Sequence, residues 1–521
     1  MSNGFELHKG HAQPAPFAAL LLVLVGFTLL YLLTFPQNFT EGEDAVWYVE
    51  RVARGAPQWH PNHLLIEPLG RLVFVALNGL GFGVSTLVTM QVLSLIAGLV
   101  TLMLIWCLTA RVTGGLLAPL GATLAVGFSF GFWLYIMMPD TYGLPLPFIV
   151  GGLCAVHRLN VRLEQARTPP PGASLWAAFL VALATLFHQQ NLFLAVAANL
   201  TLFLYALRLP AGRKAAGIRQ AFVFGLAYSA FVLGAYFFVS FALLDHRSPV
   251  ETVLWARGLA QYGLWVPFTI ASPVKSVLGL GTTIWSTTFL FGNESFLALA
   301  ERVFPGRLFD EEVFLAQNGL QLGFWPLVAL TGASVAGLLG LIGRAVIGML
   351  RGGDGQGLSL LLFVHVVISF VAITFWEPTN KEFWIAVLPS LFVLLFINAG
   401  RARVLIGLFL APLFVANLFG AMVGFARQDS DYWYMQNQWV IENAAKGDLI
   451  VDSCGYICIG YQQLFSPAAV YDWRDFKDPL ILPETGRVFV TSRALAEGAD
   501  LAGVLQERDT RLGLTIYELT R

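Results

Sequence analysis

Eleven long apolar runs constrain this chain more than any other feature of its sequence. Each has close to the roughly 20 residues that an α-helix needs to cross the ~30 Å hydrocarbon core of a bilayer. The runs fall at residues 16–35, 84–109, 115–136, 141–157, 173–188, 190–207, 220–243, 320–343, 358–376, 382–399 and 403–425, with weaker, interfacial or re-entrant runs at 68–83 and 275–291. The sequence therefore predicts an all-α polytopic membrane protein with about 11 transmembrane helices.

The composition supports this class. Of the 521 residues, 57% are hydrophobic and only 12% are charged, whereas charged residues make up about 25% of soluble domains. So few charges cannot cover a water-exposed surface, and a soluble protein of this size is excluded. The net charge of -1 also argues against a nucleic-acid partner, which needs a basic surface.

The charged residues divide the chain into two domains. Residues 427–521 hold 23 Lys, Arg, Asp and Glu residues, whereas residues 1–426 contain the apolar runs. In the tail, a helical pattern at 432–445 is followed by strand patterns that begin at residues 448, 468, 487 and 514. We therefore expect a polytopic domain over 1–426 and a small soluble α/β domain over 427–521.

Short basic loops determine the expected orientation. With a cytoplasmic N-terminus, every loop assigned to the cytoplasm contains Arg or Lys, as the positive-inside rule requires. These residues are Arg111, Arg158, Arg162, Arg167, Arg208, Arg213, Lys214, Arg219, Arg344, Arg351, Arg401 and Arg403. An odd number of spans then places the tail outside the cytoplasm, together with the loops at 36–67, 137–141, 244–319 and 377–381.

Two of the four cysteines, Cys454 and Cys458, lie in the tail. They can form a disulfide if the tail is extracytoplasmic, and a pair of unreacted thiols is the alternative. No histidine lies near this pair in the sequence, so a zinc site with about four ligands is not expected there.

The first outer loop, FTEGEDAVWYVERVARGAPQWHPNHLLIEPLGRL, concentrates groups that can carry chemistry. Its acids follow the first span, and crowded carboxylates raise one another's pKa, which suits a base that takes a proton from a hydroxyl. Asp44 is the candidate base, with Glu43 beside it. The alternative is a solvated loop with interfacial aromatic residues.

Three other polar segments interrupt the apolar pattern. Asp140 is a candidate active-site acid and also a candidate N-cap of the helix expected from Thr141, two roles that are compatible. The HQQN segment, which begins with His188 and Gln189, is either a polar site or a tight turn between spans. In FWEPTNKEFW, Lys381 is either a phosphate contact or an interfacial lysine whose ammonium reaches water.

These segments together resemble the GT-C class of membrane glycosyltransferases, which use polyprenyl-phosphate sugars, and in particular the protein O-mannosyltransferase and aminoarabinose-transferase relatives. The resemblance rests on the acids of GEDAVWYV and PDTYG, the many spans and the outer C-terminal domain. Members usually have an Asp-Glu pair in the first loop, whereas the order here is Glu43-Asp44. The HPNH stretch with Glu67-Pro68 is similar to a His-Pro segment of some bacterial members.

The resemblance implies a hexosyl- or pentosyltransferase in the cytoplasmic (inner) membrane of a bacterium. It would move a sugar from a polyprenyl-phosphate donor to a lipid, glycan or protein acceptor on the extracytoplasmic face. Asp44 would act as base, and Glu43 and Asp140 as orienting or metal-coordinating carboxylates. The substrate-binding candidates are Lys381, Arg71, His60, His63, His188, Gln189 and Glu377. The resemblance identifies no definite cofactor, and a divalent metal ion held by Glu43 and Asp140 is left open.

Two other functions fit the sequence less well. One is a multi-span transporter or lipid flippase with HQQN as its substrate site, and the other is a non-catalytic membrane subunit that presents its tail to a partner. Alternating access requires neither the one-sided distribution of acids nor the soluble tail. The enzyme is therefore the favoured hypothesis.

Overall fold

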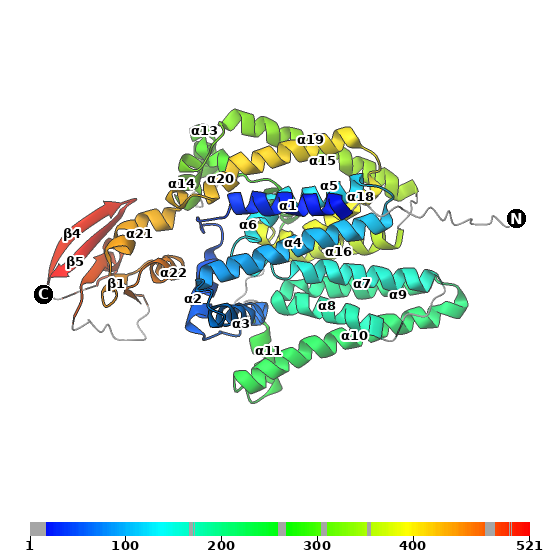
Figure 1. The fold of residues 1–521 in the computed structure, drawn as a ribbon, viewed down its shortest axis with the longest axis horizontal. Coiled ribbons are helices and arrows are strands. Elements are labelled where there is room, and N and C mark those ends of the chain that lie inside the picture. The colour runs from blue at the N-terminus through cyan, green and yellow to red at the C-terminus, as the bar shows by residue number, and fades with distance from the viewer. Residues whose placement is uncertain are drawn as a thin grey trace.

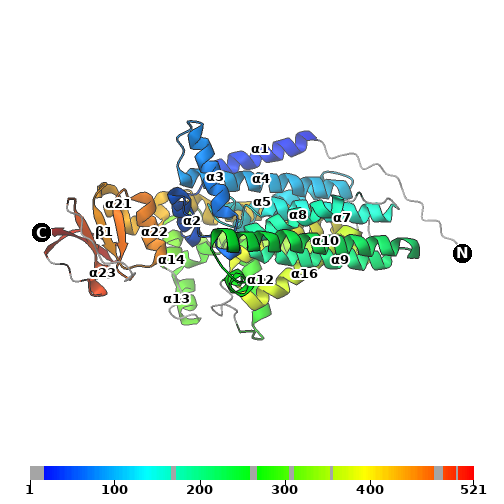
Figure 2. The same ribbon diagram turned by 90° about the horizontal axis from the view of Figure 1, so that it is seen from below.

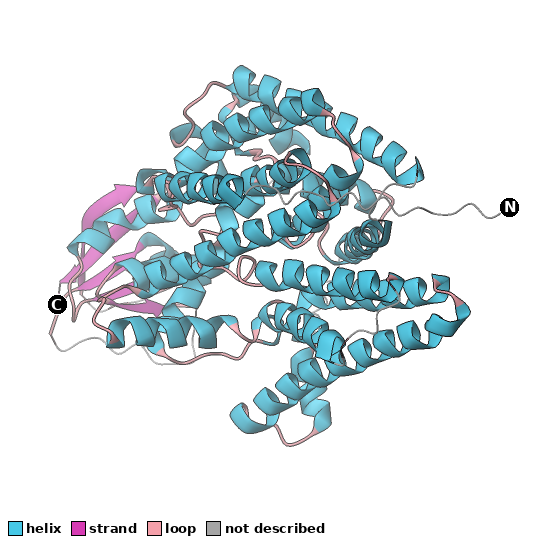
Figure 3. Ribbon diagram, turned by 45° about the vertical axis from the view of Figure 1, so that its right-hand side comes forward, coloured by secondary structure: helices cyan, strands magenta, loops and turns pink. Residues whose placement is uncertain are grey.

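The chain forms a helix bundle with a small sheet beyond one end of it. The computed structural model describes residues 17–165, 170, 172–258, 267–303, 310–351, 356–474, 485–499, 501 and 503–520. The long helices run side by side along one axis (Figure 1). Figure 3 shows the described strands gathered at one end of that axis. This arrangement confirms the expected fold class, a polytopic helical body with a small α/β tail.

Each of the eleven apolar runs contains helix in the structure. The corresponding elements are α1 (Phe17–Leu33), α4 (Thr86–Val112), α5 (Leu117–Phe128) with α6 (Phe130–Tyr135), α7 (Leu146–Glu164), α8 (Gly172–Phe187), α9 (Leu192–Arg208), α10 (Ala211–Phe238), α15 (Phe324–Arg351), α16 (Gln356–Trp376), α17 (Lys381–Ile385) with α18 (Leu388–Asn398), and α19 (Arg403–Asn417) with η6 (Leu418–Met422) and α20 (Val423–Phe425). Six of the described helices are long and apolar enough to cross a membrane. The remaining runs form shorter or interrupted helices, so the total of about 11 crossings stays a prediction.

The interrupted helices meet at Asn417. Its amide nitrogen donates to the carbonyl oxygens of Phe128 (2.7 Å) and Ile284 (2.8 Å), where α5 and α12 (Ser272–Ile284) end. Its side-chain oxygen Oδ1 accepts a hydrogen bond from the backbone N–H of Ser286 at 2.9 Å. Backbone groups freed by a break in a membrane helix must be satisfied inside the protein. Asn417 therefore satisfies the ends of two interrupted helices at once.

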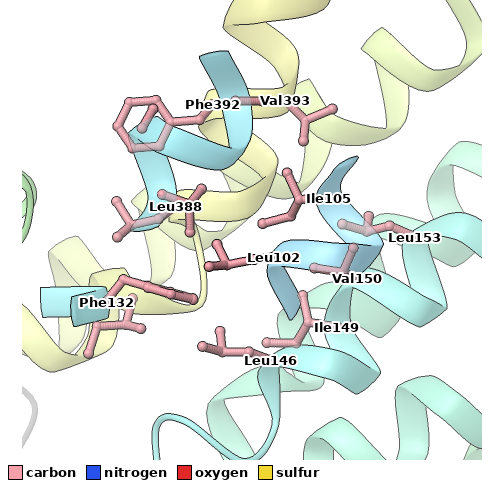
Figure 4. Packing of buried hydrophobic residues seen from close by; sticks show 14 of the residues in the cluster. Leu102, Ile105, Phe132, Leu146, Ile149, Val150, Leu153, Leu388, Phe392 and Val393 are labelled. Atoms are coloured by element: carbon pink, nitrogen blue, oxygen red, sulfur yellow. The ribbon is translucent and has the colours of Figure 1, made fainter. Parts of the chain in front are cut away.

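The core of the bundle consists of aliphatic and aromatic side chains from helices far apart in the sequence (Figure 4). They include Leu102 and Ile105 of α4, Phe132 of α6, Leu146, Ile149 and Val150 of α7, and Phe392 and Val393 of α18. In lipid, helices associate through van der Waals packing, which favours close approach at small residues. A Cβ at Gly337 of α15 would lie 2.6 Å from the backbone nitrogen of Phe409 in α19, so this contact requires glycine.

Several short helices surround the end of the bundle that faces the sheet. They are α2 (Glu43–Arg54), α3 (Ile66–Gly79), α11 (Pro249–Ala256), α12, α13 (Glu294–Val303) and α14 (Asp310–Asn318). The weak runs at 68–83 and 275–291 correspond to α3 and α12. Figure 2 shows α3 lying across the direction of α4, and its Leu72 and Val75 are exposed. This placement fits the interfacial role expected for the first weak run.

The tail has the strands expected from the sequence and one more. The predicted segments form α21 (Tyr432–Asn443), β1 (Leu449–Asp452), β2 (Ala469–Asp472), β3 (Val488–Thr491) and β5 (Leu514–Thr520). The strand order is β2-β1-β3-β5-β4, with β1 parallel to both β2 and β3 and with β5 antiparallel to both of its neighbours. The sequence did not indicate β4 (Val504–Arg511), whose residues VLQERDTR are mostly polar because it is a half-exposed edge strand.

The tail contacts the segment that leads into α2. Asp431 accepts hydrogen bonds from the backbone N–H of Phe39 (2.9 Å) and from the hydroxyl of Tyr461 (2.8 Å) on α22 (Tyr456–Phe465). A Cβ at Gly460 of α22 would lie 3.1 Å from the Val46 side chain of α2. The tail therefore supports the element that carries Asp44. Cys454 and Cys458 form a disulfide, the first of the two alternatives left open by the sequence.

We expect Asn417→Leu to destabilise the chain, because it leaves two buried carbonyl groups and one buried N–H group without their partner. Each unsatisfied group costs about 1–3 kcal/mol. Thermal unfolding in detergent should show a clearly lower Tm. The control is Asn199→Leu at a half-exposed position on α9, which should change Tm little. Equal Tm values for Asn417→Leu and the wild type would contradict this role.

Candidate active site

A cavity of about 400 Å³ lies at the end of the bundle that faces the tail. Its walls come from the start of α2, the end of α6, and from α14 and α17. The lining residues are Thr40, Glu41, Asp44, Tyr135, Glu311, Glu312, Leu315, Glu377, Thr379, Asn380, Lys381 and Glu382. Six of these are carboxylic acids and one is a lysine. The cavity is therefore polar and strongly acidic, and most of its lining residues belong to the predicted outer loops.

Asp44 occupies the first turn of α2 and is exposed to the cavity. Desolvation by the surrounding protein raises the pKa of the Asp44 carboxyl group. The positive charge of the nearby Arg51 guanidinium partly opposes this rise. Arg51 is held by Glu67 at 3.2 Å and stacks over Trp47. Asp44 is thus an accessible carboxylate whose proton affinity depends on a fixed cation.

Asp140 and Glu382 form a pair of acids that interact electrostatically with Asp44. Asp140 is 2% exposed, and its Oδ2 has no hydrogen-bond partner among the described residues. Burial and the Asp44 charge raise the pKa of Asp140. The Tyr135 hydroxyl lies 2.9 Å from Glu382 Oε1. Because a buried carboxylate beside other carboxylates ionises less readily, this pair favours keeping a proton.

Lys381 lines the cavity, as its assignment as a phosphate contact requires. Its ammonium forms an ion pair with Glu41, and its side chain is 24% exposed. Burial lowers the pKa of Lys381, but Glu41 and the neighbouring acids outweigh this effect, so the net pKa is raised and the amine is charged. A phosphate in the cavity would have to compete with Glu41 for this amine.

The three candidate histidines form one cluster behind two tyrosines. His60 stacks on His63 with ring centroids 5.1 Å apart, and His63 lies 5.0 Å from His188. Tyr48 and Tyr142 contact His63 and His188 respectively. Burial lowers the pKa of His60 to about 4, with a contribution from Arg51, and also lowers the pKa of His63. The cluster is neutral at pH 7 and does not line the cavity.

Other candidates lie elsewhere in the structure. Arg71 donates to the carbonyl oxygens of Val52 and Ala53, both at 3.1 Å, and so satisfies the end of α2 rather than lining the cavity. Gln189 donates to the carbonyl oxygen of Ala256 at 2.8 Å. The side chain of Glu43 lies outside the described residues. The roles proposed for these residues stay predictions.

Two structural interpretations of the polar segments can be decided. The N-cap of α7 is Pro145, and Asp140 instead accepts from the backbone N–H and hydroxyl of Thr141. The capping interpretation is therefore wrong, because the loop turns through Pro145 before the helix begins. HQQN forms the short turn η2 (Gln189–Asn191) between α8 and α9, as one alternative expected.

Several cavity residues were not selected from the sequence. Glu382 stands beside Lys381, and Glu311 and Glu312 belong to an acidic run in the long outer loop. The acidic character of that loop was the available signal. The position of Tyr135 was not available, because it depends on where α6 ends in space.

Among the residues that the structure describes, the acids of the cavity do not form a compact cluster of metal-ligating atoms. Among the described residues, three metal-ligating atoms lie within 4.8 Å of one another at Asp452, Cys454 and Cys458, in the tail. Asp44, Asp140 and Glu382 supply the oxygen ligands that Mg²⁺ or Mn²⁺ prefers, and Asp140 Oδ2 has no hydrogen-bond partner among the described residues. The carboxylate oxygens of these three acids, however, do not all lie within 4.8 Å of one another. We therefore derive no step through a metal ion.

The whole chain resembles a solved membrane protein in fold. No family model and no curated protein sequence matches it. The crystal structure of ArnT from Cupriavidus metallidurans bound to undecaprenyl phosphate superposes with a TM-score of 0.57 and 10% identity, over 96% of this chain and 98% of that chain. The apo crystal structure of the same protein covers the same shares with a TM-score of 0.48 and 10% identity. At this identity the likeness to the first structure shows the fold alone: the chain shares the overall architecture of that ArnT structure.

We expect Asp140→Asn to reduce the loss of stability at high pH. Carboxyl groups whose pKa is raised by folding bind more protons in the folded than in the unfolded chain, so stability falls as pH rises from their ordinary pKa to the raised one. Removing one acid of the pair removes part of this fall. Tm measured in detergent between about pH 5 and pH 8 should decline less than in the wild type. Glu377→Gln, at an exposed cavity position, is the control, and an unchanged slope for Asp140→Asn would contradict the paired-acid assignment.

Proposed function

We propose that the chain transfers a glycosyl group from a polyprenyl-phosphate donor to an acceptor on the extracytoplasmic face of the membrane. The observation that carries this proposal is Asp44, which faces an acidic cavity at the end of a bundle whose fold matches that of ArnT, crystallised with undecaprenyl phosphate. A cavity at the membrane edge can receive a lipid-borne phosphate from the bilayer and a polar acceptor from water.

In this mechanism Asp44 takes the proton of an acceptor hydroxyl as that oxygen attacks the anomeric carbon of the donor sugar. The lipid phosphate leaves as an anion and needs no proton. Lys381 would bind the phosphate, because it is the cation among the described cavity residues. Asp140 and Glu382 keep a proton between them, which leaves the ionised state to Asp44.

The distribution of charge along the bundle supports the proposed orientation. Helices α4, α9 and α15 have Arg111, Arg208 and Arg351, respectively, in their last turns. These ends point away from the sheet (Figure 1). Under the positive-inside rule, that side is cytoplasmic. The cavity and the tail would then lie on the extracytoplasmic side of the inner membrane of a bacterium.

Binding of the lipid can be tested with undecaprenyl phosphate and, as a matched ligand without the charge, undecaprenol. We expect the phosphate form to bind more tightly to the purified chain. Lys381→Met should weaken its binding about 10- to 100-fold, because a charge-assisted contact contributes roughly 1.5–3 kcal/mol. Glu41→Gln should strengthen it by releasing the amine. The control is Lys275→Met, at an exposed position on α12. Equal affinities for the two lipids would contradict the proposal.

The base can be tested through the pH dependence of transfer. Asp44 must be ionised, so its raised pKa should place the acid limb of kcat/KM above that of an ordinary Asp. Arg51→Met removes the cation that lowers this pKa and should move the limb to higher pH, whereas Arg51→Lys should move it less. Asp44→Asn should lower transfer about 10²- to 10⁴-fold without loss of lipid binding. If the acid limb of kcat/KM lies at the same pH in Arg51→Met as in the wild type, Asp44 is excluded as the base.

A further inference from the structure

An ionic cluster is buried in the tail at the carboxyl end of β1. Asp452 is fully buried and accepts hydrogen bonds from Thr491 Oγ1 at 2.6 Å and from Arg493 Nε and Nη2 at 3.0 and 2.7 Å. β1 lies between the parallel strands β2 and β3. The chain connects β1 to β2 on one side of it and then connects β2 to β3 on the other side. Reactive and ligand-binding groups gather at such positions in α/β domains.

The Cys454–Cys458 disulfide lies directly against this cluster. Cys458 belongs to the first turn of α22 and is fully buried, whereas Cys454 precedes the helix and is partly exposed. The Sγ atom of Cys458 lies 3.0 Å from Arg493 Nη2 and 3.5 Å from Asp452 Oδ2. Cys454 is therefore the more accessible of the two cysteines, and the Cys458 sulfur contacts a fixed cation and a carboxylate.

These surroundings favour a reactive cysteine pair. A guanidinium group and a helix N-terminus both stabilise a thiolate, and a stabilised thiolate is a better leaving group. A disulfide that only cross-links the chain does not need an ion pair beside its buried sulfur. Burying Asp452 and Arg493 also carries a desolvation cost. The cluster is thus better explained by chemistry at Cys458 than by stability alone.

We propose that Cys454 and Cys458 form a thiol–disulfide exchange site that reacts with an external dithiol. A thiolate of the dithiol attacks Cys454 Sγ, the Cys454–Cys458 bond breaks, and its electron pair leaves on Cys458 as a thiolate beside Arg493. The second thiol of the dithiol then attacks the mixed disulfide and releases Cys454. The chain gains two electrons and two protons, and the dithiol becomes a disulfide. In the reverse direction, the Cys458 thiolate beside Arg493 attacks Cys454 Sγ in the mixed disulfide and releases the thiolate of the dithiol.

A metal ion is the competing occupant of the reduced site, because ligand atoms of Asp452, Cys454 and Cys458 lie within 4.8 Å of one another. The guanidinium of Arg493 at the Cys458 sulfur opposes a bound cation. Exchange is therefore the reaction that the charges favour, and zinc binding to the reduced pair is an outcome that would overturn the proposal.

The order of attack can be tested on the full-length chain in detergent with two matched variants. Cys458→Ser leaves the exposed Cys454 thiol, which should form a mixed disulfide with oxidised glutathione. Cys454→Ser leaves the buried Cys458 thiol, which should react at least about 10-fold more slowly. Mass spectrometry of the tail peptides reads both reactions and separates them from Cys107 and Cys154. Equal rates, or the opposite order, would overturn the assignment.

The role of Arg493 can be tested by reducing the intact disulfide with dithiothreitol and trapping the thiols with a maleimide. Arg493→Gln should slow reduction about 10-fold, and Arg493→Lys should slow it less. Because Arg493→Gln leaves Asp452 buried without its cation, Asp452→Asn/Arg493→Gln is measured as well and should also be slow. The control is Arg487→Gln, whose ion pair with Asp448 lies in the same sheet. Three outcomes would refute the exchange site. The first is that the wild-type disulfide is reduced only when the chain unfolds, and the second is that the folded double variant is reduced at the wild-type rate. The third is that the reduced cysteines bind zinc. These readouts are independent of the proposed glycosyl transfer.

Discussion

The absence of water in the bilayer is the constraint on which this structure depends. Inside the hydrocarbon layer every backbone polar group needs a partner from the protein, so irregular segments are tolerated only where a side chain can satisfy them. Asn417 does this for the ends of α5 and α12. The broken helices in turn allow α6 and α17 to bring Tyr135, Lys381 and Glu382 to one end of the bundle, where a cavity can be polar.

Charge is distributed unevenly in that cavity. Carboxylates from three separate segments surround one lysine, and burial raises the pKa of the neighbouring Asp140. Repulsion among carboxylates is costly unless some remain protonated. The protonated pair of Asp140 and Glu382 reduces this cost, while Arg51 keeps Asp44 easier to ionise. The proposed division between a base and neutral neighbours therefore follows from burial and from the position of one arginine.

The sequence predicted what depends on local pattern and missed what depends on assembly. Apolar runs located the helices, and alternating residues located four strands, because each pattern is set by neighbours along the chain. The edge strand β4 was missed because its exposed residues are mostly polar. Asp44 and Lys381 do share the cavity, but Arg71 satisfies the end of α2, a contact that only the folded backbone defines. Glu382 and Tyr135 belong to the cavity because α6 packs near α17, which no local pattern states.

The central claim, that Asp44 drives cleavage of a polyprenyl-phosphate sugar, is tested most directly by mass spectrometry of the lipids that copurify with the chain. Wild type and Asp44→Asn would be purified from the same cells in the same detergent. The account predicts that the variant retains the intact sugar-bearing lipid, whereas the wild type retains polyprenyl phosphate, because only the wild type completes transfer. Phospholipids alone in both preparations, or the same polyprenyl lipid in both, would contradict the account.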